Sequence, residues 1–149
     1  GSTIVLIEEF IGSGGSAIKN YRRLKKALDA DGKQVRIVYF SLVAMVSGSN
    51  ALAAEGVEHY VRRLLDRGIS DFYEGAERDR AVSLMERLES ELCPVSDDGR
   101  LKKLHFGYAR SETLYVHQGG NACNNVFPLF WWRWLRGPKA RATIMDRLQ

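Results

Sequence analysis

The sequence predicts an α/β fold in which a parallel sheet is flanked by helices. Ile4–Ile7 is a short apolar run rich in β-branched residues, which is typical of a central strand covered on both faces. Val35–Phe40 is a second such run. Between them, apolar residues recur at helical spacing: Ile18, Tyr21, Leu24 and Leu28. Strand, helix and strand together form the unit from which parallel sheets are built.

The limits of these first elements follow from capping and turn residues. Ser16 is the expected N-cap of the first helix, and Asp31–Gly32 is its expected end. The second strand extends toward Val46, and Gly48–Asn50 interrupts the pattern.

Two more helices and one more strand are expected further along the chain. One helix ends near Gly68, and a third strand covers Thr113–Val116, after a turn-rich loop at Pro94–Gly99. The first of these helices is indicated by Val57, Tyr60, Val61, Leu64 and Leu65, and the second by Ala81, Leu84, Met85, Leu88 and Leu92. Because no linker or repeat interrupts residues 1–149, we expect a single domain. Gly1–Ser2 resembles a cloning remnant and is set aside.

Composition indicates a globular protein with an anionic ligand. The 149 residues are 45% hydrophobic and 27% charged, with a net charge of +4. No apolar run could span a bilayer and no signal-peptide pattern is present, so we expect no membrane association and a cytoplasmic location. The cysteines and histidines have no zinc-site spacing, which predicts free thiols in a reducing compartment; they are Cys93, Cys123, His59, His105 and His117.

A glycine- and serine-rich loop links the first strand to the first helix. Gly12, Gly14 and Gly15 let the backbone approach a ligand closely, and successive N–H groups at a helix N-terminus attract a phosphate. Ser13 and Ser16 add hydroxyl donors. The simpler interpretation is a tight turn without a ligand.

Adjacent carboxylates precede this loop at the expected tip of the strand. Side chains alternate across a strand, so Glu8 and Glu9 point in different directions near one edge. One can accept hydrogen bonds from the vicinal hydroxyls of a sugar, and the other can hold Mg²⁺ through water or restrain the loop. The alternative is a solvated pair of charges.

The segment Val5–Ser16, VLIEEFIGSGGS, resembles the phosphoribosyl-pyrophosphate motif of type I phosphoribosyltransferases. Glu8 and Glu9 match its acidic pair, Phe10 and Ile11 its apolar pair, and Gly12–Ser16 its 5′-phosphate loop. The resemblance implies a Rossmann-like sheet, and specifically the C-terminal part of that fold. It also implies ribose and magnesium binding by the two acids, with Mg²⁺ held indirectly. The sequence departs from the motif in having Glu-Glu and a final serine.

The segment Val116–Trp132 resembles a signature of phosphoribosyltransferase-like proteins from bacterial conflict systems, including retron and anti-phage loci. Asn124 and Asn125 are its secondary candidates for ligand binding, and Pro128 and Trp131 complete the match. Phe127, Phe130 and Trp131 are explained equally well as core aromatics.

The resemblance implies that phosphoribose is transferred from phosphoribosyl pyrophosphate to a nitrogen acceptor. The alternative is a module of the same fold that senses a nucleotide or ribose phosphate without turnover. The motif strand usually follows other strands, so we expect a protein partner or a preceding segment beside it. Nucleic-acid contact is a less favoured interpretation of the basic residues in Lys19–Lys26 and of the aromatic-basic segment Trp131–Arg136.

Overall fold

The structure, a computed structural model, describes residues 1–96, 99–116, 119–137 and 139–147. The chain divides into two compact units, Gly1–Leu65 and Asp66–Gln149, which are described separately. That the two together form one phosphoribosyltransferase-like domain stays a prediction.

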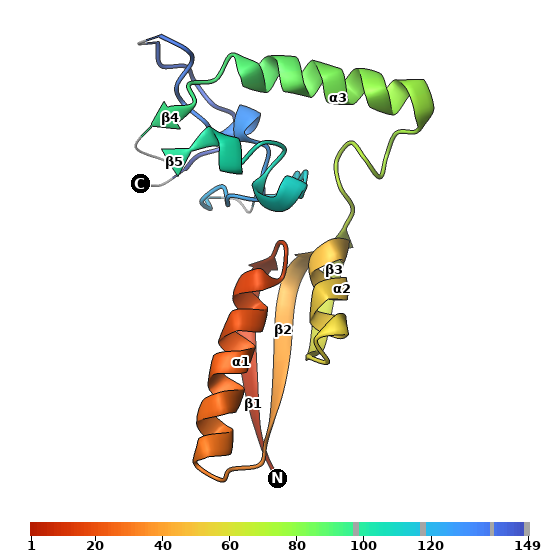
Figure 1. Ribbon diagram of the computed structural model, residues 1–149, viewed down its shortest axis with the longest axis vertical. Coiled ribbons are helices and arrows are strands. Elements are labelled where there is room, and N and C mark those ends of the chain that lie inside the picture. The colour runs from red at the N-terminus through yellow and green to blue at the C-terminus, as the bar shows by residue number, and fades with distance from the viewer. Residues whose placement is uncertain (97–98, 117–118, 138, 148–149) are drawn as a thin grey trace. The chain divides into compact units, whose positions relative to one another are not determined.

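The first unit is a β-α-β-α-β arrangement (Figure 1). Its elements are β1 (Ser2–Ile11), α1 (Gly15–Ala30), β2 (Val35–Met45), α2 (Val46–Ala54) and β3 (Glu58–Leu65). The strands form an open parallel sheet in the order β1-β2-β3, with Ile4 opposite Ile37. The predicted Rossmann-like α/β fold is therefore confirmed, as is the parallel pairing of the first two predicted strands.

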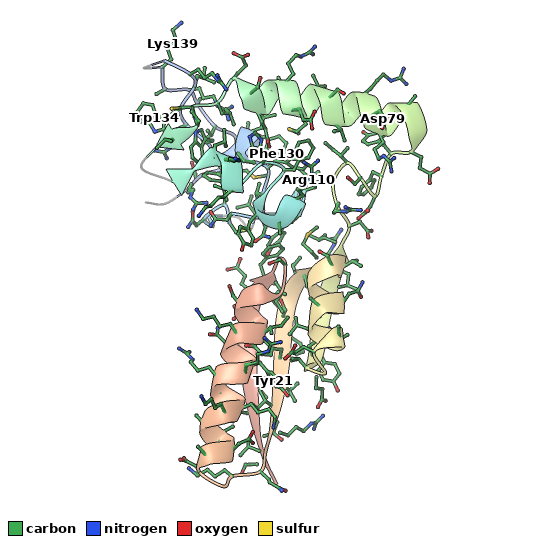
Figure 2. The ribbon with its side chains drawn as sticks, in the orientation of Figure 1. Tyr21, Asp79, Arg110, Phe130, Trp134 and Lys139 are labelled. Carbon is green, nitrogen blue, oxygen red and sulfur yellow. The ribbon has the colours of Figure 1, made fainter. Side chains whose placement is uncertain are left out.

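Both helices pack on one face of this sheet. Tyr21 lies on the side of α1 that meets the strands (Figure 2). Leu52 packs from α2 into the same cluster. The strands contribute Leu6, Tyr39 and Val61, whose side chains point to this face because the parallel register places Leu6 beside Tyr39.

The opposite face of the sheet carries exposed apolar side chains. Ile7 is 78% exposed, and its register partner Phe40 and the next partner, Tyr60, are also exposed. Val5, Leu42 and Leu64 extend this surface. The prediction that Ile4–Ile7 is a central strand covered on both faces is wrong for the described residues, because β1 is an edge strand whose side chains alternate between half-buried and exposed.

The predicted helix through Val57–Leu65 is also wrong, because these residues form β3. The apolar positions fit a period of 3.6 residues, but they also fit a strand in which His59 and Val61 alternate with Tyr60 and Leu64. Parallel pairing with β2 decides between the two patterns, since Val61 lies opposite Ser41.

Two local predictions about helix ends are corrected as well. Gly48–Asn50 does not interrupt the structure but lies inside α2, which follows β2 without a loop. The second strand does extend as predicted, to Met45. Ser16 is not the N-cap of α1; Gly14 takes that position with φ 80°, in the left-handed region that favours glycine.

The second unit contains one long helix, α3 (Gly75–Ser90), at the place where a helix was predicted. Short elements follow: the strands β4 (Val95–Ser96) and β5 (Gly99–Arg100), and the 3-10 helices η1 (Leu101–Lys103), η2 (Tyr108–Arg110) and η3 (Pro128–Phe130). The first of these strands lies in the expected loop Pro94–Gly99, of which residues 97–98 are outside the described residues. The predicted strand Thr113–Val116 is wrong, because only an isolated bridge joins Thr113 to Val126.

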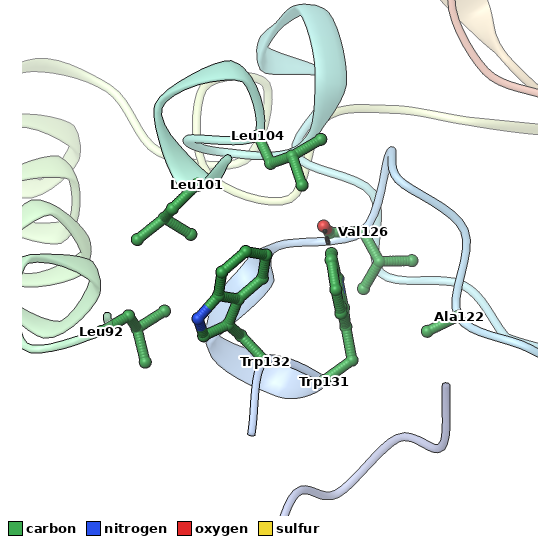
Figure 3. Close-up of a cluster of buried hydrophobic side chains, with 7 residues drawn as sticks. All are labelled: Leu92, Leu101, Leu104, Ala122, Val126, Trp131 and Trp132. Atoms are coloured by element: carbon green, nitrogen blue, oxygen red, sulfur yellow. Dashed lines mark hydrogen bonds between the residues drawn. The ribbon is translucent and has the colours of Figure 1, made fainter. Parts of the chain in front are cut away.

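The core of the second unit surrounds two adjacent tryptophans (Figure 3). Trp131 and Trp132 are both 0% exposed, which confirms the core interpretation of Trp131. Their surroundings are apolar: Leu92, Leu101, Leu104, Ala122 and Val126. The two indoles differ in one respect. Trp131 Nε1 donates to the carbonyl oxygen of Val126 at 3.2 Å, whereas the buried Trp132 Nε1 has no partner among the described residues.

This difference allows a matched test of the core. We expect Trp131→Phe to lower the free energy of unfolding by about 0.5–1.5 kcal/mol more than Trp132→Phe, because only the first loses a hydrogen bond. Trp131→Phe also weakens the contact of the Arg147 guanidinium, 4.1 Å from the Trp131 ring centroid, because a phenyl ring attracts a cation less strongly than an indole. Urea unfolding of both variants measures the difference. Equal losses of unfolding free energy would mean that the hydrogen bond of Trp131 does not stabilise the core.

Candidate functional site

Glu8 and Glu9 lie within β1 and not at its tip, because the strand continues through Phe10 to Ile11. Their side chains belong to opposite faces of the sheet. Glu8 is half-buried on the face covered by the helices, in register with Ser41, whereas Glu9 is exposed on the open face. The two carboxylates therefore cannot act as one cluster on a single ligand atom.

Glu8 lines a groove between β1 and α1 with a volume of 380 Å³. Leu6 and Tyr39 form its apolar wall, and Asn20 and Arg23 of α1 add polar groups. The groove thus combines a carboxylate acceptor with amide and guanidinium donors, which suits a polar ligand with hydroxyl or phosphate groups.

Tyr39 connects the sheet to the start of α1. Its hydroxyl donates to the carbonyl oxygen of Ala17 at 2.8 Å. Burial raises the pKa of Tyr39, and the nearby negative charge of Glu8 raises this pKa further, so the phenol stays neutral and keeps donating. The first turn of α1 is held in place on the sheet by this bond.

Gly12–Ser16 contains the turn from β1 into α1 and the first residues of the helix. The first bond of the helix runs from the N–H of Ile18 to the carbonyl oxygen of Gly14 at 2.9 Å, and no side chain caps the preceding N–H groups. The backbone N–H groups of Gly15, Ser16 and Ala17 precede that bond, and such groups have no acceptor within a helix. The predicted loop therefore has the form of an anion-binding helix N-terminus.

Gly48 of α2 determines how this loop is placed. A Cβ at Gly48 would lie 2.1 Å from the carbonyl oxygen of Gly12. In return, a Cβ at Gly14 would lie 3.0 Å from the carbonyl oxygen of Gly48. The two backbones are in such close contact that only glycine fits at Gly48, so α2 supports the loop from behind.

Asn124 and Asn125, the secondary candidates, lie in the second unit. The Asn125 side chain donates to Ser111 Oγ at 3.2 Å and to the carbonyl oxygen of Tyr108 at 3.4 Å, and is therefore engaged in supporting a turn. Asn124 is exposed, and its carbonyl oxygen accepts the N–H of Tyr108 at 2.7 Å. A ligand-binding role for either residue stays a prediction.

The donor set fits magnesium only when the ligand supplies most of the coordination. Among the described residues, no group of three or more His, Cys, Asp or Glu side chains could hold a metal ion, and His117 lies outside them. Mg²⁺ is commonly held by one or two carboxylates together with water and substrate phosphates. Glu8, with its carboxylate in the groove, fits such a role through water better than Glu9, which faces away.

Two residues that contribute to the site were missed by sequence reasoning. Gly48 was interpreted as a break, because nothing near it in sequence indicates contact with Gly12. Tyr39 was interpreted as an ordinary strand residue; its signal is a single hydroxyl within an apolar run, which requires a buried hydrogen-bond partner. Cys93 and Cys123 are free thiols, as predicted, and no helix in the described part of the chain is long and apolar enough to cross a bilayer.

A parallel sheet with an acidic pair in its first strand and a glycine loop behind it is the arrangement that the resemblance to phosphoribosyltransferases implies. The chain matches the PRTase-CE family model over residues 1–136 and belongs to this family. The match spans both units and includes the acids, the loop and Asn124–Asn125. A search of curated proteins gave no match.

The contact between Gly48 and Gly12 gives a test of the loop. We expect Gly48→Ala to destabilise the protein by about 1–3 kcal/mol, because the new methyl group meets backbone that cannot move away without shifting the loop. The matched control is Gly15→Ala, whose Cβ would meet only Ser13 Oγ, at 3.7 Å. Since alanine favours a helix, the control should melt at the same temperature as the wild type or slightly higher. If both variants melt alike, the loop does not depend on α2.

Proposed function

We propose that this protein binds phosphoribosyl pyrophosphate, or a related ribose phosphate, with Mg²⁺, and transfers the phosphoribosyl group to a nitrogen acceptor. In that reaction a nitrogen–carbon bond forms at the anomeric carbon of ribose while the bond to pyrophosphate breaks. Pyrophosphate leaves with the bonding electron pair, and the acceptor nitrogen releases a proton. The observation that carries the proposal is the uncapped start of α1 directly behind the acidic pair of β1.

The loop would hold the 5′-phosphate. The N–H groups that begin α1 and the helix dipole favour a dianion, and the hydroxyl groups of Ser13 and Ser16 can each donate a hydrogen bond to this dianion. The contact of Gly48 with Gly12 fixes the loop before the ligand arrives, which lowers the entropy lost on binding.

The acids would serve the ribose and the metal separately. Glu8 in the groove can accept hydrogen bonds from vicinal hydroxyls, or hold Mg²⁺ through water. Positive charge develops on the ribose ring as pyrophosphate departs, and a nearby carboxylate stabilises it. Magnesium, when bound, neutralises charge on pyrophosphate. Glu9, on the open face, can act only on a ligand or a segment on that side.

A further polypeptide segment, either a partner or a preceding part of the chain, is part of the proposal. Parallel sheets are normally covered on both faces, whereas Ile7, Phe40 and Tyr60 are exposed in the first unit. The edge of β1 also leaves backbone groups without a strand beside them. Both features support a segment that covers this surface.

The biological setting that we propose is bacterial defence against phage, in the cytoplasm. Its support is the likeness of Asn124–Asn125 and Pro128–Trp131 to the signature of conflict-system proteins, together with membership of the family. In the structure Trp131 serves the core, so only the asparagine pair is exposed enough to contribute to a ligand site.

The double variant Glu8→Gln, Glu9→Gln tests the proposal. We expect unfolding free energy to change by less than about 1 kcal/mol, because neither side chain is a core residue. Affinity for phosphoribosyl pyrophosphate with Mg²⁺ should fall tenfold or more, since charged hydrogen bonds exceed the roughly 1.4 kcal/mol that this requires. Calorimetric titration and a thermal melt, on the fullest available assembly containing this chain, measure both.

The matched control is Glu86→Gln, an exposed glutamate on α3 that should affect neither measurement. A second binding variant, Gly15→Asp, places a negative charge at the start of α1, where an added Cβ would meet only Ser13 Oγ at 3.7 Å, and should also abolish binding. If the double variant has a much lower melting temperature but the folded molecules bind phosphoribosyl pyrophosphate with unchanged affinity, the acids are structural and the proposed function is wrong.

A further inference from the structure

The turn through residues 105–112 has an unusual backbone. Phe106, Ala109, Arg110 and Glu112 all have φ between 49° and 58°, although none of them is glycine. Residues with side chains rarely adopt this left-handed region, and such strain concentrates at functional sites. Gly107 lies among them at φ 77°, and a Cβ there would be 1.9 Å from the carbonyl oxygen of Asn125.

A buried carboxylate holds the start of this turn. Glu89 of α3 is 0% exposed, and its Oε2 lies 2.7 Å from His105 Nδ1. Both of its oxygens also accept the N–H of Phe106, at 3.3 and 3.2 Å. The bond to Glu89 fixes the imidazole with Nδ1 inward, so the half-exposed ring presents its Nε2 side outward.

A second buried carboxylate holds the end of the turn. Glu112 is 1% exposed, and it accepts the N–H groups of Ile69 and Ser70, at 2.9 and 2.7 Å, and the Ser70 hydroxyl. Ser111 Oγ in turn donates to the carbonyl oxygen of Asn125 at 2.7 Å. Glu89 therefore fixes the start of the strained turn and Glu112 fixes its end, while the bond from Ser111 to Asn125 fixes the backbone between them. The shape of the turn is set before any ligand binds.

The polar groups that this turn presents have no hydrogen-bond partner among the described residues. Arg110 is exposed (Figure 2), and its guanidinium carbon lies 4.3 Å from the centroid of the Phe106 ring. Among the described residues, no acceptor is bonded to the Arg110 guanidinium, to the Tyr108 hydroxyl or to His105 Nε2. Burial raises the pKa of the Glu89 carboxyl, while the hydrogen bond with His105 and the nearby guanidinium of Arg110 lower this pKa, so both residues are neighbours of Glu89.

We propose that the turn 105–112 is a second anion site, which takes the phosphate group of a nucleotide or free phosphate. The Arg110 guanidinium binds two phosphate oxygens side by side. When the imidazole is protonated, His105 donates from Nδ1 to Glu89 and from Nε2 to a third phosphate oxygen. Stacking on Phe106 limits the freedom of the Arg110 guanidinium, and the bond to Glu89 orients the His105 imidazole. Both groups therefore lose little conformational entropy when a ligand binds. Tyr108, half exposed beside them, offers a ring on which a base can stack.

A purely structural role does not account for the exposed groups. If the turn served only to pack the second unit, Glu89, Glu112 and Asn125 would suffice, and residues 108–110 could be any polar residues in a relaxed conformation. The turn instead carries an exposed arginine and a half-exposed histidine that are both neighbours of the buried Glu89. This turn belongs to the second unit, whereas the loop at Gly12–Ser16 belongs to the first.

Nuclear magnetic resonance of the full chain tests this site directly. The reporters are the His105 ring and the Arg110 Nε–H resonances, during titration with inorganic phosphate and, separately, with adenosine monophosphate. The Gly15→Asp background is expected to remove binding at the proposed loop of α1 by charge repulsion, at a position that has room for a Cβ. We expect saturable shifts of both reporters in this background. A tighter response to the nucleotide would identify a nucleotide as the source of the phosphate, and equal responses would identify phosphate alone.

Substitutions then separate binding from packing. Arg110→Gln should weaken binding at least tenfold, Arg110→Lys should weaken it less because it keeps the charge, and His105→Gln should weaken it severalfold. The control Arg87→Gln, on exposed α3, should change affinity less than twofold. The Phe106 amide resonance reports whether the turn is intact in each variant. Absence of saturable shifts at millimolar phosphate, or equal effects of Arg110→Gln and Arg87→Gln with the turn intact, would overturn the proposal.

Discussion

The first unit depends on one close contact between backbones, that of Gly48 with Gly12. It requires β2 to continue into α2 without a loop, so that the first turns of α2 come up behind the turn that follows β1. Parallel pairing of the two strands sets the height at which this happens, with Ile11 opposite Ala44. Any side chain at Gly48 would push the two elements apart. The shape of the candidate phosphate loop is thus a consequence of packing between helices and strands, and its own glycines only permit that shape.

The sequence predicted β1, α1 and β2 because their patterns are local and unambiguous. The 3.6-residue period of Ile18 to Leu28 fits only a helix, and Val35–Phe40 is too short and too β-branched for one. β3 was mistaken for a helix because Val57, Val61 and Leu64 recur at helical spacing, and only the pairing of β3 with β2 shows that the segment is a strand. Gly48 and the strained turn after His105 depend on residues distant in sequence, and no local pattern could indicate them. The glycine loop does link β1 to α1 as expected, but the acids do not lie at the strand tip, since β1 continues to Ile11.

Alternation along β1 separates the two acids by function as well as by face. Glu8 shares the helix-covered side with Tyr39, close enough to raise the pKa of that phenol, and lies in the groove beside α1. Glu9 lies on the face of the sheet that carries the exposed side chains of Ile7 and Phe40. Two adjacent acids in a strand therefore do not bind one ligand atom together. The alternation places one carboxylate in the helix-side groove and the other on the open face of the sheet.

The two units prepare polar donors in physically different ways. At the start of α1 the donors are backbone N–H groups. Orienting these groups costs little conformational energy because Gly14 adopts its left-handed φ without strain. In the turn 105–112, four residues with side chains adopt that region, at about 1–2 kcal/mol each. Charge-assisted bonds to Glu89 and Glu112 contribute roughly 1.5–3 kcal/mol each and can offset that strain. Both carboxylates also need these bonds, because a buried carboxylate without partners would be costly. Strain and burial therefore depend on each other: the carboxylates keep the turn in its strained shape, and the turn supplies the donors that allow the carboxylates to be buried.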